Sequence, residues 1–228
     1  IKSFFNRKSF LKEIDLSSIT LKSPDFPTKQ NNVDVIIPTL RRRDYLLQVV
    51  DDLKNQTLLP KKVIVVEQNP DYQSNTELPE LTSNSWPFEI VHHFIHKTGA
   101  CTARNIALEE VSAEWVFFAD DDIRLESDLL KSSLLELNRL DVDCLNLSTY
   151  QIGEKKFFKK IKQWGSFGSG LSIVNSHFAK EIEFLNVFEY GFGEDQDYGM
   201  QLRYGGCDII YHPDLEILHL KATRGGFR

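Results

Sequence analysis

Three consecutive aspartates, Asp120, Asp121 and Asp122, directly follow the apolar residues 115–119. Along an extended segment alternate side chains point to the same side, so we expect Asp120 and Asp122 to converge on one site. Two carboxylates at a strand end form the hard-oxygen site that Mg²⁺ or Mn²⁺ prefers, with positions left for water and phosphate oxygens. An acidic turn that caps the next helix is the alternative explanation.

A second acidic cluster, at residues 191–198, places Glu194, Asp195 and Asp197 behind two glycines where a helix is expected to begin. Carboxylates in that position are favoured by the helix dipole, so capping by Glu194 or Asp195 is one explanation. The functional alternative is a general base held beside the metal site. Asp197, further along the helix, is expected to brace the loop.

Basic residues follow two further expected strand ends. Gly99 and its small neighbours open an expected helix, and Arg104 lies in its first turns, an arrangement that suits an anionic phosphate. The arginine run that begins at Arg41 follows Pro38 and Thr39 and is a second candidate for phosphate contacts. For both sets, the alternative is that the basic side chains are simply solvated at the protein surface.

His219, near the last expected strand, is a candidate third metal ligand, and a partly buried strand histidine is the alternative. The chain has neither HExxH nor paired-histidine spacing. It also lacks the Gly-x-Gly-x-x-Gly fingerprint, the phosphate-binding GxxxxGK[ST] loop and the Gly-x-Ser-x-Gly elbow. These absences argue against a dinucleotide-binding fold, P-loop nucleotide hydrolysis and an α/β-hydrolase.

The elements that must position these residues begin at residue 33, where short apolar runs start to alternate with helical patterns. Strands are expected at 33–37, 62–66, 89–95, 115–119, 142–147, 171–174, 207–211 and 215–218, and helices at 43–54, 102–111, 127–139, 176–184 and up to 203. Uninterrupted apolar strands between helices predict an α/β fold, with a mostly parallel central sheet covered by helices on both faces. Ligands of such sheets bind at the carboxyl ends of the strands.

Composition sets the class of the protein. The chain has 228 residues, of which 41% are hydrophobic and 26% charged, as expected for one large globular domain. Residues 1–32 differ in composition and are interpreted as an appendage to the domain at 33–228. The net charge of -6 gives no electrostatic reason to expect a nucleic-acid partner.

The cysteines and the apolar runs bear on location. Cys101, Cys144 and Cys207 form no CxxC pair and are interpreted as small core residues in a reducing compartment. No apolar run approaches the ~20 residues of a membrane span. No signal peptide is visible, and because the chain opens with Ile1, the true N-terminus is expected to be missing.

Taken in order, these features resemble family 2 glycosyltransferases, which are inverting, nucleotide-sugar-dependent enzymes with a GT-A (Rossmann-like) fold. The resemblance runs from about Val33 to His219. It rests on the strand and turn at 35–39, the strand at 63–67, Gly-x-x-x-x-Arg-Asn at 99–105, the DxD-type element at 117–122, the small-residue turn at 168–170 and Gly-Glu-Asp-x-Asp at 193–197. Two positions depart from the family pattern, because Glu67 replaces the usual aspartate and Leu40 the usual aromatic residue.

The resemblance implies a role for each matching residue. Residues 33–122 would form the nucleotide-binding half and residues 123–228 the acceptor-binding half. The donor, which is expected to be a UDP-sugar, would meet Pro38, Thr39, Arg41, Glu67, Gly99, Arg104, Asp120 and Asp121. Asp120, Asp122 and His219 would hold Mn²⁺ or Mg²⁺, Asp195 would deprotonate the acceptor hydroxyl and Glu194 would orient the acceptor.

Three other functions are alternatives to glycosyl transfer. A nucleotidyltransferase would carry a glycine-rich loop after the first strand, where this chain has Pro38, Thr39 and Leu40. A receiver-type signalling domain would be shorter and would leave the cluster at Glu194 unexplained. A catalytically inactive GT-A domain that binds carbohydrate or serves as a scaffold is disfavoured by the intact Asp120, Asp122 and Asp195.

The expected partners are a nucleotide-sugar donor and a glycan or glycolipid acceptor. The lysine-rich residues 154–162 raise the hypothesis of peripheral contact with an anionic membrane through Lys155 to Lys162, or of a phosphate-bearing acceptor, with a surface loop as the alternative. The expected location is cytoplasmic, or peripheral at the inner membrane face.

Overall fold

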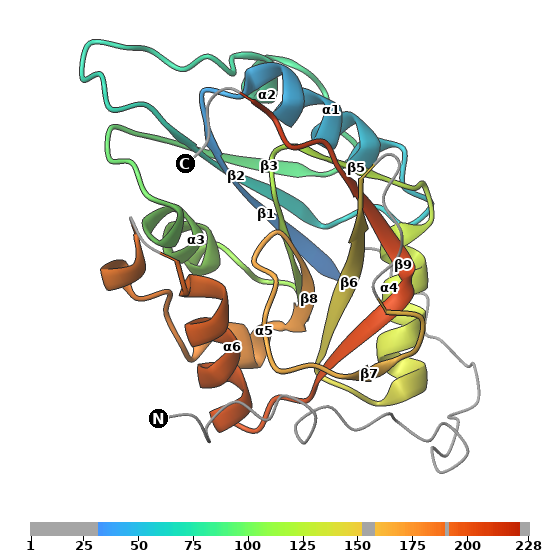
Figure 1. The fold of residues 1–228 in the computed structure, drawn as a ribbon. Helices are drawn as coiled ribbons and strands as arrows, with labels where there is room; N and C mark the ends of the chain where they lie inside the picture. The colour runs from blue at the N-terminus through green and yellow to red at the C-terminus, as the bar shows by residue number, and fades with distance from the viewer. Residues whose placement is uncertain (1–31, 152–157, 190–191, 224–228) are drawn as a thin grey trace.

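The computed structural model describes residues 32–151, 158–189 and 192–223. These residues contain one nine-stranded sheet with strand order β3-β2-β1-β4-β8-β6-β9-β5, and β7 pairs with β9 outside that path (Figure 1). The strands are β1 (Val33–Leu40), β2 (Lys62–Gln68), β3 (Glu89–Ile95), β4 (Trp115–Ala119), β5 (Ile123–Leu125), β6 (Cys144–Tyr150), β7 (Lys162–Gln163), β8 (Leu171–Asn175) and β9 (Ile209–His219).

The sheet is parallel in one half and mixed in the other. β3, β2, β1 and β4 are parallel neighbours, as the alternating sequence pattern predicts. β8 is antiparallel to both β4 and β6, while β5 and β7 pair antiparallel with β9. The expectation of a mostly parallel sheet is therefore wrong for the second half. β6 and β8 are neighbours there, and the described residues between them form no crossover helix of the kind that a parallel connection needs.

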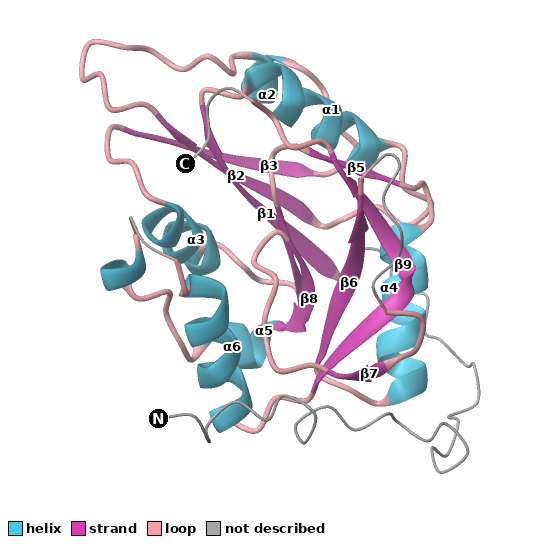
Figure 2. Cartoon of the chain, viewed as in Figure 1, coloured by secondary structure: helices cyan, strands magenta, loops and turns pink. Residues whose placement is uncertain are grey.

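Helices cover both faces of the sheet, as expected (Figure 2). One hydrophobic core packs α1, α2 and α4 against the sheet, and a second core packs α3, α5 and α6 against the opposite face. The helices are α1 (Arg43–Lys54), α2 (Glu80–Ser83), α3 (Ala100–Glu109), α4 (Leu129–Leu140), α5 (Ser176–Lys180) and α6 (Glu194–Tyr204), with a 3₁₀ turn, η3 (Asn186–Phe188).

Strand β1 shows why this sequence forms a central strand. Val35 and Ile37 belong to one core and Ile36 to the other, because successive side chains of a strand point to opposite faces. A run without polar interruption can therefore be buried on both sides. Cys101, Cys144 and Cys207 are buried and free, which confirms that they are core residues.

Several boundaries differ from the sequence prediction. The two short strands expected at 207–211 and 215–218 form one long strand, β9, which contains Pro213. The pairing with β6 shifts there, because Leu147 faces His212 while Ser148 faces Glu216. Proline is tolerated at such irregular positions, which explains why the sequence reads as two strands. Helix α5 ends at Lys180 rather than at residue 184, and the Asn175 side chain caps its start by accepting a hydrogen bond from the His177 amide.

Among the described residues, no helix combines the length and the apolar character required to cross a membrane.

Candidate active site

The carboxyl ends of β1 and β4 and the end of β9 meet at one edge of the sheet, beside the first turn of α6. A cleft of about 510 Å³ opens there. It brings together residues from segments that are far apart in the sequence: Pro38, Arg42, Ala100, Arg104, Asp120, Asp121, Asp122, Ser169, Gly170, Leu171, Glu194, Asp195, His219, Lys221, Ala222 and Thr223. Most of the residues expected to bind metal, phosphate or acceptor therefore share one cavity.

Asp120, Asp122 and His219 form the candidate metal site. Each offers one ligand atom, and these three atoms lie within 4.8 Å of one another. The pairing of β5 with β9 brings them together, because Ile123, the residue after Asp122, stands opposite His219. Two carboxylate oxygens and an imidazole nitrogen fit Mn²⁺ well and Mg²⁺ less closely, since imidazole favours transition metals.

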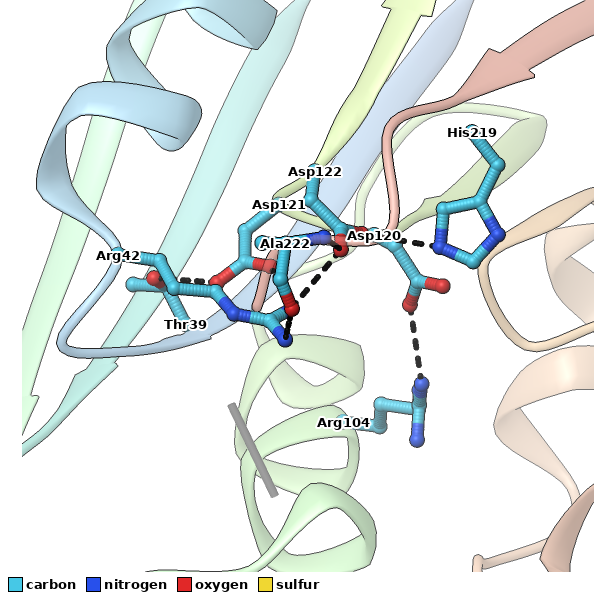
Figure 3. Close-up of polar contacts among 8 residues, drawn as sticks. All are labelled: Thr39, Arg42, Arg104, Asp120, Asp121, Asp122, His219 and Ala222. Atoms are coloured by element: carbon cyan, nitrogen blue, oxygen red, sulfur yellow. Dashed lines mark hydrogen bonds and ion pairs between the residues drawn. The ribbon is translucent and has the colours of Figure 1, made fainter. Parts of the chain in front are cut away.

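The charges of this trio support binding of a cation. His219 Nε2 lies 3.2 Å from Asp122 Oδ1 (Figure 3). Burial alone raises the pKa of Asp122, but hydrogen bonds from His219 and from the Ala222 amide, with the charge of Arg42, hold it below its ordinary value. The hydrogen bond to Asp122 raises the pKa of His219. Asp122 is therefore an anion that attracts a positive partner. A divalent ion can take the place of that partner.

Asp121 faces away from this trio and joins two other parts of the site. Its Oδ2 accepts a hydrogen bond of 2.7 Å from Thr39 Oγ1, and its Oδ1 lies 2.9 Å from Arg42 Nη1. Burial raises the pKa of Asp121 to about 6, although Thr39 and Arg42 act in the opposite direction. Arg42 also contacts Asp122 Oδ2 at 3.2 Å and donates to the Ala222 carbonyl, so it links the end of β1 to the segment after β9.

Arg104 supplies a buried cation to the same cleft. The residue is only 5% exposed, and its Nη2 lies 3.5 Å from Asp120 Oδ1 (Figure 3). Its Nε and Nη1 are buried and have no hydrogen-bond partner among the described residues. Buried donors of a charged group are costly when they stay unsatisfied, so this guanidinium is suited to an anionic ligand such as a phosphate.

Asp195 and Glu194 occupy the first turn of α6. Asp195 Oδ1 accepts a hydrogen bond of 3.3 Å from the Ser169 amide, and Glu194 Oε2 accepts one of 3.1 Å from the Gly193 amide. Burial raises the pKa of Asp195, and the charge of Arg104 offsets only part of that effect. A carboxylate with a raised pKa beside a cleft is a good candidate for a general base. Asp197 accepts a hydrogen bond of 2.7 Å from the Gln201 side chain within α6.

The start of α3 is already occupied by a carboxylate, which corrects the expectation that its amides face a phosphate. Glu189 accepts hydrogen bonds from the amides of Cys101 and Thr102 and from the Thr102 hydroxyl. Gly99 has a φ of 148°, and a Cβ at this position would overlap the Glu189 side chain. The glycine therefore makes room for Glu189, and Gly99 does not line the cleft.

Glu67, Arg41 and Thr39 lie beside the cleft rather than in its wall. Glu67 stands opposite Thr39 in the β1–β2 pair, and its buried carboxylate accepts hydrogen bonds from Thr76, from the Glu77 amide and, at 2.9 Å, from His92. It thus anchors the loop that follows β2. Arg41 is exposed, has a φ of 55° and donates to Asn69 Oδ1 at 3.1 Å.

The sequence prediction did not single out two residues that hold the site together. Arg42 stands in an arginine run, and nothing in the sequence distinguishes it from Arg41 and Arg43. Glu189 is a lone glutamate in a segment without periodicity, so only the folded loop shows that it reaches α3. The amides at the start of a helix need acceptors. A search for acidic residues that could cap α3 would therefore have been the one way to find Glu189 from the sequence.

The lysine-rich segment is only partly described, since Lys155 and Lys156 lie outside the described residues. Lys159 and Lys160 are exposed. Lys162 is only 8% exposed, and its ammonium lies over the Phe158 ring, 2.9 Å from the centroid. The hypothesis of a membrane contact that includes Lys162 is therefore wrong for this residue, because its charge is enclosed by aromatic side chains.

Comparison with known proteins connects this site to a family. The Glycosyl transferase family 2 profile matches residues 34–200. A Campylobacter jejuni GalNAc(5)-diNAcBac-PP-undecaprenol beta-1,3-glucosyltransferase is 26% identical over 106 residues, 46% of this chain and 34% of that protein. A Borreliella burgdorferi cholesterol galactosyltransferase is 30% identical over 100 residues, 43% of this chain and 27% of that protein. The matched segments thus span about a third of these relatives.

Solved structures share the fold. S. aureus TarS in complex with UDP-GlcNAc superimposes with a TM-score of 0.68 and 19% identity, over 86% of this chain and 60% of that chain. Mannosyltransferase PcManGT from Pyrobaculum calidifontis, in complex with GDP-Man and Mn²⁺, superimposes with a TM-score of 0.66 and 17% identity, over 91% of this chain and 61% of that chain. These structures identify the GT-A fold. Because the family profile covers most of the chain as well, the chain belongs to glycosyltransferase family 2.

Proposed function

We propose that this chain transfers a sugar from a nucleoside diphosphate donor, of which a UDP-sugar is the first candidate, to a hydroxyl of a glycan or glycolipid acceptor, with inversion at the anomeric carbon. One observation carries the proposal. The candidate metal ligands, the buried guanidinium of Arg104 and the carboxylate of Asp195 line the same cleft. A diphosphate needs the first two, and a reacting hydroxyl needs the third.

The donor end of the cleft is built for negative charge. Asp120, Asp122 and His219 would hold a divalent ion, which when bound would neutralise charge that develops on the leaving diphosphate. The unsatisfied donors of Arg104 would bind phosphate oxygens from the side of α3. Thr39 and Glu67, at adjoining strand ends, would lie toward the nucleoside. Residues 33–122 supply most of these groups, which supports the assignment of this half to the donor.

The acceptor end is organised around Asp195. Its carboxylate would take the proton of the acceptor hydroxyl while that oxygen attacks the anomeric carbon. The bond from this carbon to the diphosphate breaks on the opposite face, and the nucleoside diphosphate leaves with the bonding electrons. A single displacement inverts the carbon. The Ser169 amide orients the carboxylate, and Glu194, one residue before it, would orient the acceptor.

The class of acceptor is proposed by analogy with the relatives alone. The names of the matched C. jejuni and B. burgdorferi proteins describe transfer to an undecaprenol-linked glycan and to cholesterol. By this analogy we propose a lipid-linked or polysaccharide acceptor. A lipid-linked acceptor would place the reaction at the cytoplasmic face of the inner membrane, where the exposed Lys159 and Lys160 could meet anionic lipid.

The first test is calorimetric titration of UDP into the protein with and without Mn²⁺, in the wild type and in Asp122→Ala. Binding that requires Mn²⁺ and is lost in the variant is expected. A UDP-sugar screen then identifies the donor, and Asp195→Asn is expected to bind UDP normally but to lose transfer. If neither UDP nor any other nucleoside diphosphate binds, a catalytically inactive carbohydrate-binding domain becomes the better explanation.

A further inference from the structure

The chain continues past the end of β9 into the wall of the cleft, where Lys221, Ala222 and Thr223 line the same cavity as the candidate metal ligands. Lys221 stands out because its backbone φ is 52°. This is the left-handed region, which residues with a Cβ adopt at a cost in energy. A strained backbone in the wall of a ligand site is a reason to ask what the side chain does there.

Hydrogen bonds on both sides of Lys221 hold this conformation in place. The Ala222 amide donates to Asp122 Oδ2 at 2.9 Å (Figure 3). The Leu220 amide donates to the backbone carbonyl of the same aspartate, also at 2.9 Å. The Ala222 carbonyl in turn accepts from Arg42 Nη2 at 3.3 Å. The two neighbours of Lys221 are therefore tied to one candidate metal ligand, and the lysine side chain takes no part in these bonds.

The Lys221 side chain is exposed, and within the described residues its ammonium forms no hydrogen bond or ion pair. Its charge nevertheless reaches the candidate metal site. The hydrogen bond to Asp122 raises the pKa of His219, and the charge of Lys221 opposes that rise. The cleft thus holds an ammonium beside the candidate metal ligands that is not committed to any group of the protein.

The other basic side chains that line the cleft already have carboxylate partners. Arg42 contacts two aspartates, and His219 contacts Asp122. Arg104 contacts Asp120 with one nitrogen and keeps two donors for a ligand. Lys221 is the remaining basic residue of this lining. A lysine that lies in an acidic cleft and pairs with none of its described carboxylates is suited to a ligand that brings its own negative charge.

We propose that Lys221 binds the diphosphate of the nucleotide-sugar donor from the side of β9, while Arg104 binds it from the side of α3. The inference rests on the proposed function, since it takes the cleft as the donor site. A diphosphate has more anionic oxygens than one metal ion and one guanidinium satisfy, and an ammonium can direct three rotatable donors to the others. The left-handed backbone at Lys221, which destabilises the free protein, would then serve donor binding.

Three variants test the assignment. Lys221→Asn removes the ammonium and introduces a residue that tolerates the left-handed conformation, so the fold is kept. Lys221→Arg keeps a cation at the same place. Lys131→Asn removes an exposed lysine of α4 and is the control. UDP titration in the presence of Mn²⁺ gives the Kd of each protein. Thermal unfolding with Mn²⁺ alone reports on the metal site, and urea denaturation without ligand reports on the fold.

Lys221→Asn is expected to bind UDP about tenfold more weakly than the wild type, the scale of one lost charge-assisted hydrogen bond. Its midpoint in urea should be no lower than that of the wild type, because asparagine suits the backbone better than lysine does. Its Mn²⁺-dependent shift should be at least as large, since loss of a nearby positive charge does not weaken a cation site. Lys221→Arg should keep most of the UDP affinity, and the control all of it.

Equal UDP affinity in Lys221→Asn and the wild type would overturn the inference. An equal loss in Lys221→Arg and Lys221→Asn would do the same, because the charge would then not be the cause. A smaller Mn²⁺ shift in Lys221→Asn would also contradict it, since Lys221 would then act through the metal ligands. A wild type that binds no nucleoside diphosphate would overturn the proposed function itself, so the two failures are distinguishable.

Discussion

Glu189 accepts hydrogen bonds from both the amide and the hydroxyl of Thr102, at 3.0 and 2.5 Å, although 87 residues separate the two positions. A third hydrogen bond of 2.7 Å comes from the Cys101 amide. The carboxylate thus accepts hydrogen bonds from amides at the start of α3 that have no partner within the helix. Its negative charge also lies favourably at the positive end of the helix dipole. Because Arg104 lies on α3 and Asp195 lies in the first turn of α6, a few residues after Glu189, this contact ties α3 to the segment that precedes α6.

Replacement of Glu189 by Gln is expected to lower the free energy of unfolding by about 1–2 kcal/mol, the scale of a lost helix cap with a charged acceptor. The variant keeps the side-chain volume but loses the negative charge. Urea denaturation measures the change, with the exposed Glu181→Gln as the control. An unfolding midpoint equal to that of the control would contradict the role of Glu189 as a cap.

Loss of Arg42 is expected to destabilise the site, whereas loss of the neighbouring exposed Arg41 is not. Arg42→Ala leaves the buried Asp121 without its cationic partner, and we expect a loss of about 2–3 kcal/mol, as for other half-removed buried charge pairs. Arg42→Lys should recover only part of this, because an ammonium does not reproduce the fork that reaches Asp121, Asp122 and Ala222. Urea denaturation of both variants gives these values.

The exposed Arg41 provides the matched control, and Arg41→Ala should change the unfolding free energy by no more than about 0.5 kcal/mol. Equal losses in the two alanine variants would show that the contacts of Arg42 contribute no special stability.

A comparison of the aspartates with the arginines shows which site residues the sequence can predict. Asp120 and Asp122 could be paired in advance, because β4 is an apolar run with a definite end and side chains alternate along an extended segment. Arg42 could not be separated from Arg41, since the left-handed φ of 55° at Arg41 turns the chain and decides which arginine points back toward Asp121. The backbone angle of a single residue leaves no periodic signal in the sequence.

The strands likewise divide into those that the sequence predicts and those that depend on tertiary contacts. The parallel strands β1 to β4 were predictable because each is a buried run followed by a helical pattern. β5 and β7 have only three and two residues, and they exist because β9 offers them a pairing edge. The structure places His219 beside Asp120 and Asp122. This placement depends on the β5–β9 register, a tertiary contact that the local sequence does not show.

Binding of Mn²⁺ is expected to raise the melting temperature of the wild type, because a ligand that binds only the folded state stabilises it by about 2.7 kcal/mol at a hundredfold excess over its Kd. Asp122→Asn should abolish this shift, since Asp122 lies between His219 and Arg42 and loses its charge. His219→Ala should reduce it. Thermal unfolding with and without Mn²⁺ measures the effect.

Glu109→Gln, on the exposed part of α3, is the control for loss of an acidic residue and should shift with Mn²⁺ as the wild type does. A Mn²⁺-dependent shift that survives in Asp122→Asn would place the ion elsewhere on the protein.

Asp195→Asn is expected to stabilise the fold while it removes transfer. Burial raises the pKa of Asp195, so the folded state binds its proton more tightly than the unfolded state does. The stability contribution of such a group is greatest below the ordinary aspartate pKa of about 3.9 and falls as the pH rises through the raised pKa. Asparagine has no such titration and keeps an oxygen that can accept from the Ser169 amide.

The variant should therefore gain about 1 kcal/mol over the wild type near pH 7, and this gain should shrink toward about pH 4. Urea denaturation of both proteins across this range isolates Asp195, because every other titrating group is common to the two and cancels in the difference. A gain that is independent of pH would show that the raised pKa is not its source. A wild type that is the more stable protein near neutral pH would mean that attraction to Arg104 outweighs burial, and Asp195 would then be held as an ion from well below neutrality.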